Sequence, residues 1–214
     1  MFNPSYVSER LDVQQLIPES ATLILDVGCS TGSLGAAIKR RTASKVIGIE
    51  YSPEMADVAS GQLDRVFVGD ATQVLGSNEL EAYKFDAILF ADVLEHLVDP
   101  WSALRSATRF LSEGGVVIAS IPNIRHIYTL GNLLFKGYWP YNDRGIHDRT
   151  HLRFFTKKNI LELFQGAGLR VDSARATYRL IERPNSINRF AKWFAVPIMR
   201  DFLAFQYLVR ASRA

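Results

Sequence analysis

Three carboxylates lie at or next to the ends of short apolar runs in the first third of the chain. Asp26 lies in the run Thr22 to Val27, which opens into the turn Gly28 to Gly32. Glu50 ends a second run about twenty residues beyond this turn, and Asp70 follows a third. If these runs are parallel strands, their carboxyl ends share the edge of a sheet at which open α/β folds bind ligands. There a glycine turn admits a ligand to the backbone, and a carboxylate such as Glu50 can accept hydrogen bonds from both hydroxyls of a ribose.

The spacing of the glycines leaves two kinds of ligand open. Gly28, Gly32 and Gly35 form G-x-x-x-G-x-x-G, whereas the fingerprint of a dinucleotide site is G-x-G-x-x-G. The difference argues against a dinucleotide site and leaves a site for another nucleoside-type ligand possible. A nicotinamide-dependent oxidoreductase therefore remains an alternative function.

A second group of reactive residues lies in the irregular stretch from about 123 to 153. His126, His147 and His151 fall in or beside it. A histidine that titrates near neutral pH suits removal of a proton from a hydroxyl group. We expect His151, and after it His147, to be the catalytic base, with Asp148 orienting the imidazole of either one. The alternative is that the pair of carboxylate and imidazole serves only as a structural pin.

The same stretch is rich in aromatic and basic residues. Aromatic rings stack on a sugar or another ring, and guanidinium groups hold phosphate or carboxylate. We therefore expect the substrate that accepts the transferred group to be bound here. The alternative is that these residues form a lid packed on the sheet. The expected acceptor-binding residues are Tyr128, Tyr138, Trp139, Tyr141, Arg149 and Arg153.

Alternating apolar runs and amphipathic segments predict the elements that must position these groups. The pattern is typical of a single α/β domain over residues 1–214, Rossmann-like and doubly wound, with a mostly parallel seven-stranded sheet and an antiparallel C-terminal strand. The expected strands are 22–27, 45–50, 65–68, 85–91, 115–121, 169–178 and 202–210. The expected helices are 8–17, 33–41, 53–60, 100–111 and 157–165, with a short one within 187–199.

The composition of the chain limits which kinds of partner and location are expected. The formal net charge of +3 and the scattered Lys and Arg residues make nucleic acid an unexpected partner. The one cysteine, Cys29, and the lack of a signal peptide or a long apolar run indicate a cytoplasmic protein. The apolar, basic segment at about 187–199 suggests contact with a membrane surface or a homodimer, and core packing competes with both. No metal is expected, because no cluster of His, Asp and Glu with ligand spacing is evident.

Four motifs in order resemble the class I S-adenosylmethionine-dependent methyltransferases of type 11 or type 23. They are the turn after Asp26, the acid Glu50, Asp70 with Ala71, and the segment Phe85 to Leu97, which resembles the family's FD-strand-LEHL segment. Ser30 stands where many members have glycine. The resemblance implies a methyltransferase whose cofactor is S-adenosylmethionine and whose product is S-adenosylhomocysteine. It places the cofactor on Asp26, Gly28, Cys29, Ser30, Gly32, Glu50, Tyr51, Asp70, Ala71, Phe90, Ala91, Asp92 and Val93.

The expected reaction is methylation of a hydroxyl on a small-molecule, sugar, glycan or lipid-linked acceptor, by in-line displacement. A glycan-type acceptor is the first choice, because the stretch from 123 to 153 is rich in aromatic residues and Arg. A third possibility is a protein that binds S-adenosylmethionine without catalysis and serves as an interaction partner.

Overall fold

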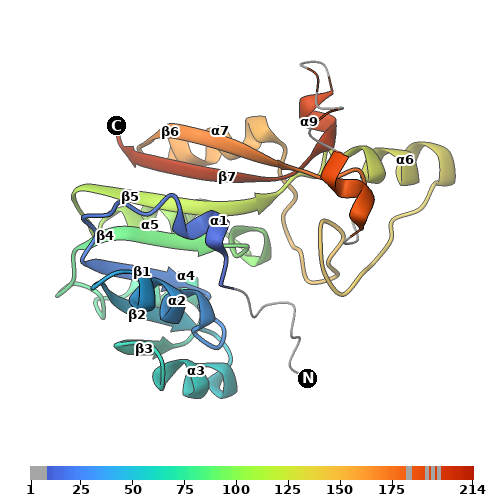
Figure 1. Ribbon diagram of the computed structural model, residues 1–214. Helices are drawn as coiled ribbons and strands as arrows, with labels where there is room; N and C mark the ends of the chain where they lie inside the picture. The colour runs from blue at the N-terminus through green and yellow to red at the C-terminus, as the bar shows by residue number, and fades with distance from the viewer. Residues whose placement is uncertain (1–8, 182–184, 191–192, 194–195, 197–198) are drawn as a thin grey trace.

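A seven-stranded sheet forms the centre of the computed structural model (Figure 1), which describes residues 9–181, 185–190, 193, 196 and 199–214. The strand order is β3-β2-β1-β4-β5-β7-β6. Only β7 runs antiparallel to its neighbours, so the predicted architecture is confirmed. The strands are β1 Leu23–Val27, β2 Lys45–Glu50, β3 Arg65–Val68, β4 Phe85–Ala91, β5 Leu111–Pro122, β6 Leu169–Tyr178 and β7 Ala204–Arg213.

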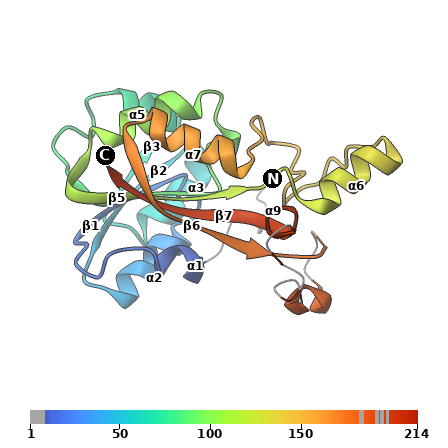
Figure 2. The same ribbon diagram turned by 90° about the horizontal axis from the view of Figure 1, so that it is seen from above.

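Helices cover both faces of the sheet (Figure 2). One apolar cluster joins the strands to α4, α5 and α7, and a second joins the opposite face to α1, α2 and α3. In the strand order, β2 and β3 lie on one side of β1, and β4 and the later strands lie on the other. Ligands bind α/β sheets at such a switch point between β1 and β4. These helices are α1 Leu11–Gln14, α2 Ser33–Arg41, α3 Pro53–Ser60, α4 Ala71–Gly76, α5 Pro100–Thr108 and α7 Lys157–Gly166.

The structure corrects several predicted boundaries. α5 ends at Thr108, and β5 already begins at Leu111, with a register shift against β4 before the run that we expected to be the whole strand. The first helix is shorter than the expected 8–17: it spans Leu11–Gln14, and its N-cap, Arg10, has a left-handed φ of 44°. β7 begins and ends slightly later than predicted.

The stretch after β5 contains a helix that the sequence pattern did not predict. α6, Ile127–Lys136, extends away from the sheet (Figures 1 and 2). Its apolar residues face outward: Leu134 is 75% exposed and Phe135 is 88% exposed, while Thr129 and Asn132 are buried.

The predicted helix within 187–199 falls largely outside the described residues. In this part of the chain the structure gives the 3₁₀ helix η3, Ser186–Phe190, and the short α9, Arg200–Leu203. Among the described residues, no helix combines the length and the apolar character needed to cross a membrane.

Candidate active site

The glycine turn after β1 is held against the end of β2 by backbone hydrogen bonds. The N–H groups of Gly28 and Cys29 donate to the carbonyl of Ile49 at 2.8 and 3.0 Å. Gly28 has a φ of 68°, and a Cβ there would lie 2.7 Å from Cγ2 of Val93. Ser30 takes up a left-handed φ of 52°, a conformation that glycine adopts with less strain.

Asp26 is buried next to this turn. Its Oδ2 has no hydrogen-bond partner among the described residues. Burial, and after it the charge of Glu50, raises the pKa of Asp26 to about 7. An unpaired carboxylate at a ligand-binding edge is suited to a cationic or hydrogen-bond-donating ligand.

The carboxylates after β2 and β3 also hold the backbone at this edge. Glu50 accepts hydrogen bonds from the N–H groups of Ser30 and Ser52 at 2.8 and 2.9 Å, so it couples the turn to the end of β2. Asp70 caps α4 through Oδ1, which accepts from two N–H groups of the first turn. Its other oxygen takes no part in this cap. The structural role that competed with ligand binding at Asp70 is thus present, and it leaves half of the carboxylate for a ligand.

The remaining residues expected near the cofactor lie at the same edge, with different exposure. Cys29 is buried, its pKa is raised first by burial, and a Cβ on Gly48 would lie 2.5 Å from its Sγ, which fits a packing role. Ala71 and Phe90 are buried, whereas Tyr51 is exposed at the rim.

An arginine from the N-terminal segment reaches the end of β4. Arg10 pairs with Asp92 and with Asp12, and it donates to Oγ of Ser120 at 2.9 Å. Ser120 donates in turn to Asp92, which has a left-handed φ of 58°. Gln206 also donates to Ser120. The sequence pattern gave no indication of Arg10, because it lies before the first strand and belongs to no motif.

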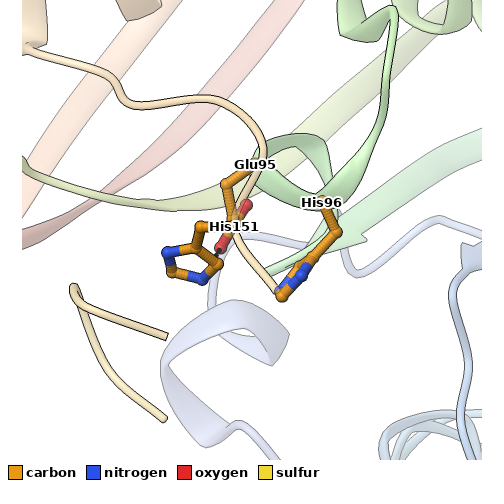
Figure 3. Close-up of side chains that lie close together, drawn as sticks. All are labelled: Glu95, His96 and His151. Carbon is orange, nitrogen blue, oxygen red and sulfur yellow. Dashed lines mark ion pairs between the residues drawn. The ribbon is translucent and has the colours of Figure 1, made fainter. Parts of the chain in front are cut away.

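Glu95, His96 and His151 come together just beyond Val93 (Figure 3). The ligand atoms of the three side chains lie within 4.8 Å of one another. Glu95 is 1% exposed, and neither of its carboxylate oxygens has a hydrogen-bond partner among the described residues. Nε2 of His151 faces Oε1 of Glu95 at 3.9 Å, which is too long for a hydrogen bond.

Backbone groups fix the two imidazole rings. Nδ1 of His151 lies 3.1 Å from the carbonyl oxygen of Ile146. Nδ1 of His96 lies 3.3 Å from the carbonyl oxygen of Thr150 and 3.1 Å from its Oγ1. Burial is the largest cause that lowers the pKa of His151, to about 4, and that of His96. Burial also raises the pKa of Glu95 well above its ordinary value, and the charge of Asp92 adds to this.

The structure places the two expected catalytic histidines apart. His151 belongs to the cluster described above, whereas His147 is buried among aromatic rings of the insertion, 4.8 Å from Trp139 and 5.8 Å from Tyr128 between ring centroids. Asp148, which we expected to orient an imidazole, accepts from the N–H and Oγ1 of Thr150 and so reaches His96 through that side chain. Tyr128 and Trp139 are thus partly engaged in the core of the insertion.

The other expected acceptor residues lie toward the surface. Tyr138 and Tyr141 are exposed, and Arg149 pairs with Asp143 at 2.8 Å, also on the surface. Arg153 donates to the carbonyl of Val98, 5.7 Å above the ring of Trp101. The six residues therefore differ in exposure and in their partners.

Comparison with known proteins gives the family. The model of a methyltransferase domain matches residues 5–174. A ubiquinone biosynthesis O-methyltransferase of Cereibacter sphaeroides (strain ATCC 17025) is 25% identical over 174 residues, 77% of this chain and 69% of that protein. A protein of the same name from Xanthomonas oryzae pv. oryzae (strain PXO99A) is 33% identical over 121 residues, 55% of this chain and 48% of that protein. This chain thus matches about half to two thirds of the length of these two relatives.

Solved structures agree on the fold. A SAM-dependent methyltransferase from Archaeoglobus fulgidus superposes with a TM-score of 0.64 at 16% identity, over 95% of this chain and 94% of the other. An S-adenosylmethionine-dependent methyltransferase from Mesorhizobium loti gives a TM-score of 0.64 at 18% identity, over 96% and 98%. The glycine turn, the carboxylates at the switch point and the family match together show that the chain belongs to the class I S-adenosylmethionine-dependent methyltransferases.

Proposed function

We propose that the chain binds S-adenosylmethionine at the edge formed by β1, β2 and β4 and methylates a hydroxyl group of a ring-bearing acceptor. One observation carries this proposal. The buried carboxylates Asp26 and Glu50 flank a glycine turn with no room for a Cβ at Gly28, and the residue that fills that space, Val93, leads within two residues to Glu95. The expected cofactor edge and the polar cluster with His151 are therefore adjacent.

The residues present fit this cofactor. We assign Glu50 to the ribose hydroxyls and Asp70 to the adenine side. We assign the cationic end to Oδ2 of Asp26, which has no hydrogen-bond partner in the described part of the chain. When bound, S-adenosylmethionine supplies an electrophilic methyl group. The chain's own residues have to bind and orient the acceptor, exclude water and relieve the acceptor hydroxyl of its proton.

We assign activation of the acceptor hydroxyl to His151. Since its pKa is lowered to about 4, the imidazole is neutral at pH 7, but it is a weaker base than the histidine titrating near neutral pH that the sequence led us to expect. The carbonyl of Ile146 at Nδ1 favours a proton on that nitrogen, so that Nε2 presents its lone pair on the side of Glu95. His147, by contrast, contacts the rings of Trp139 and Tyr128 edge-on and is not part of the cluster with Glu95.

The insertion and the relatives support a ring-bearing acceptor. The aromatic residues around His147 and the exposed Tyr138 and Tyr141 are suited to stacking on a flat or cyclic molecule. Relatives named ubiquinone biosynthesis O-methyltransferase favour a hydroxylated aromatic ring as the acceptor. A sugar hydroxyl is the second acceptor to be tested. The outward apolar residues of α6 suit an acceptor with an apolar portion. Contact of the segment 187–199 with a membrane or with a second copy remains a proposal.

The test begins with the cofactor. Calorimetric titration of the purified protein with S-adenosylhomocysteine should show one site per chain, and titration with NAD should show none. The reverse result would support the oxidoreductase and overturn the proposal. Formation of S-adenosylhomocysteine is then measured with a dihydroxylated benzoate and with a panel of sugars. Binding of the cofactor without turnover on either arm would support a non-catalytic protein.

A further inference from the structure

We propose that Glu95, His96 and His151 bind a divalent first-row transition metal ion such as Zn²⁺, which positions the acceptor oxygen for methylation. Two imidazoles and one carboxylate are a ligand set of catalytic metal centres that keep positions open for substrate or water. The role in methylation rests on the proposed function, whereas binding of the ion does not.

The buried carboxylate is the first independent observation that points to a ligand. Glu95 is 1% exposed, and both of its oxygens lack a hydrogen-bond partner among the described residues. A buried polar group without a partner costs free energy, so native proteins rarely keep one without a reason. Its Oε1 faces Nε2 of His151 across 3.9 Å, a separation in which the two atoms can approach one ion rather than one another.

The second observation is the way in which the imidazoles are held. Metal-binding histidines usually give their other ring nitrogen to a carbonyl or a carboxylate, which fixes the ring and its tautomer. Nδ1 of His151 has this contact with Ile146, and Nδ1 of His96 has it with Thr150. Thr150 is itself held by Asp148, which is buried. A chain of hydrogen bonds thus supports the ligands from behind.

The ligand types select the metal. Imidazole nitrogen favours Zn²⁺, Co²⁺, Fe²⁺ and Ni²⁺, while Mg²⁺ prefers oxygen ligands and its own waters. With three protein ligands, a fourth position remains for an oxygen of the acceptor. A hydroxyl bound there becomes more acidic and gives its proton to water, and its lone pair forms the new C–O bond while the S–C bond breaks and leaves its electron pair on sulfur. His151 then gives its lone pair to the ion. In this form of the proposal, His151 activates the acceptor hydroxyl through the metal.

The sequence spacing could not indicate this site. Glu95 and His96 follow β4, whereas His151 ends the insertion after β5, so only the fold brings them together. The N–H groups of Leu152 and Arg153 donate to the carbonyl of Glu95, each at 2.9 Å. These bonds tie the end of the insertion to the segment after β4 and place His151 beside Glu95.

The experiment measures metal binding on the whole chain, independently of turnover. Protein stripped with EDTA and then freed of chelator is titrated with Co²⁺, and the visible absorption and the heat of binding are recorded. The variants are Glu95→Gln and His151→Asn, with Glu162→Gln, an exposed carboxylate on α7, as the matched control. Each protein is also titrated with S-adenosylhomocysteine, and its folding is checked by circular dichroism.

We expect one Co²⁺ per chain in the wild type and in Glu162→Gln, displaced by Zn²⁺ but not by Mg²⁺ at the same concentration. Glu95→Gln should weaken Co²⁺ binding at least tenfold while it keeps the fold, because the amide has the same shape as the buried carboxylic acid. His151→Asn should weaken it likewise. Absence of Co²⁺ binding in the wild type, or equal binding by folded Glu95→Gln, would overturn the proposal. If the wild type and all variants fail to bind S-adenosylhomocysteine while the wild type binds Co²⁺, the proposed function is overturned and the metal site is still supported.

Discussion

Replacing Asp26 with Asn should make the protein more stable at alkaline pH and weaken its hold on the cofactor. The carboxylate is buried and its Oδ2 has no partner among the described residues, so its ionised form is unfavourable in the folded chain. The pKa is raised from 3.8 to about 7, so the folded state binds the proton more tightly than the unfolded state does. Stability from this group is therefore fully present below about pH 4 and is lost as the pH rises to about 7.

The size of this effect follows from the shift. Each pKa unit corresponds to about 1.4 kcal/mol, so a rise from 3.8 to about 7 lowers the free energy of unfolding by about 4 kcal/mol between pH 4 and pH 8. An asparagine carries no charge, yet it leaves an amide that also lacks partners. We therefore expect Asp26→Asn to gain about 2 kcal/mol over the wild type at pH 8 and to gain nothing at pH 4.

Cofactor binding should respond in the opposite sense. S-adenosylhomocysteine carries an α-ammonium group, which favours an ionised carboxylate beside it. Since only the ionised form of Asp26 would bind well, affinity should rise about tenfold from pH 6 to pH 8 in the wild type. In Asp26→Asn the affinity should be lower at pH 8 and nearly independent of pH.

The assays are urea denaturation at pH 4, 5, 6, 7 and 8 and calorimetric titration at pH 5, 6, 7 and 8. Asp86→Asn is the control: Asp86, at the opposite end of β4, accepts from the N–H groups of Thr22 and Leu23 and from the hydroxyl of Ser112. These bonds lower the pKa of Asp86, against the effect of burial. Asp86→Asn should lose about 1–3 kcal/mol of stability without a change in affinity. If Asp26→Asn were less stable than the wild type at pH 8, the reasoning about Asp26 would be refuted.

Three other substitutions test separate parts of the structure. Gly28→Ala should weaken S-adenosylhomocysteine binding at least tenfold in calorimetry, because the new Cβ would meet Val93 at a φ of 68°, whereas Gly131→Ala, in open space on α6, should leave binding unchanged. Arg10→Met should lower the free energy of unfolding in urea by about 2 kcal/mol, since it leaves the half-buried carboxylate of Asp92 without the guanidinium group. An unchanged free energy of unfolding would show that the ion pair does not stabilise the fold. Thr156→Ala should cost about 1 kcal/mol in the same assay by breaking the capping box of α7, and a loss below the error of the measurement would contradict the role of that box.

The parts of the fold that could be predicted are those in which burial sets the sequence pattern. β2, β4 and α2 have the predicted boundaries, because continuous buried apolar runs and an amphipathic helix give clear sequence signals. α6 was missed because its outward residues are apolar and its buried ones, Thr129 and Asn132, are polar. α4 was missed because Asp70 caps a helix too short to show a period.

The candidate site also has a part that the sequence predicts and a part that it does not. The acids Asp26 and Glu50 and the turn between them were predicted from local motifs, since one strand-turn-helix unit and the end of the next strand position them all. Arg10 belongs to no motif and could not be predicted. The approach of His151 to Glu95 also could not, because it depends on the path of a long insertion that has no regular pattern.

The unpaired carboxylates at the edge of the sheet have a consequence for the lifetime of the protein in the cell. Asp26 and Glu95 are buried, and carboxylate oxygens of both lack hydrogen-bond partners among the residues that the structure describes. The ligand-free chain therefore carries a free-energy cost that a bound cation would relieve. A ligand at a hundred times its Kd adds about 2.7 kcal/mol to the free energy of unfolding. Proteases that act on the unfolded chain should therefore remove the protein fastest when its cofactor is scarce, so that the supply of methyl donor would set the amount of enzyme as well as its rate.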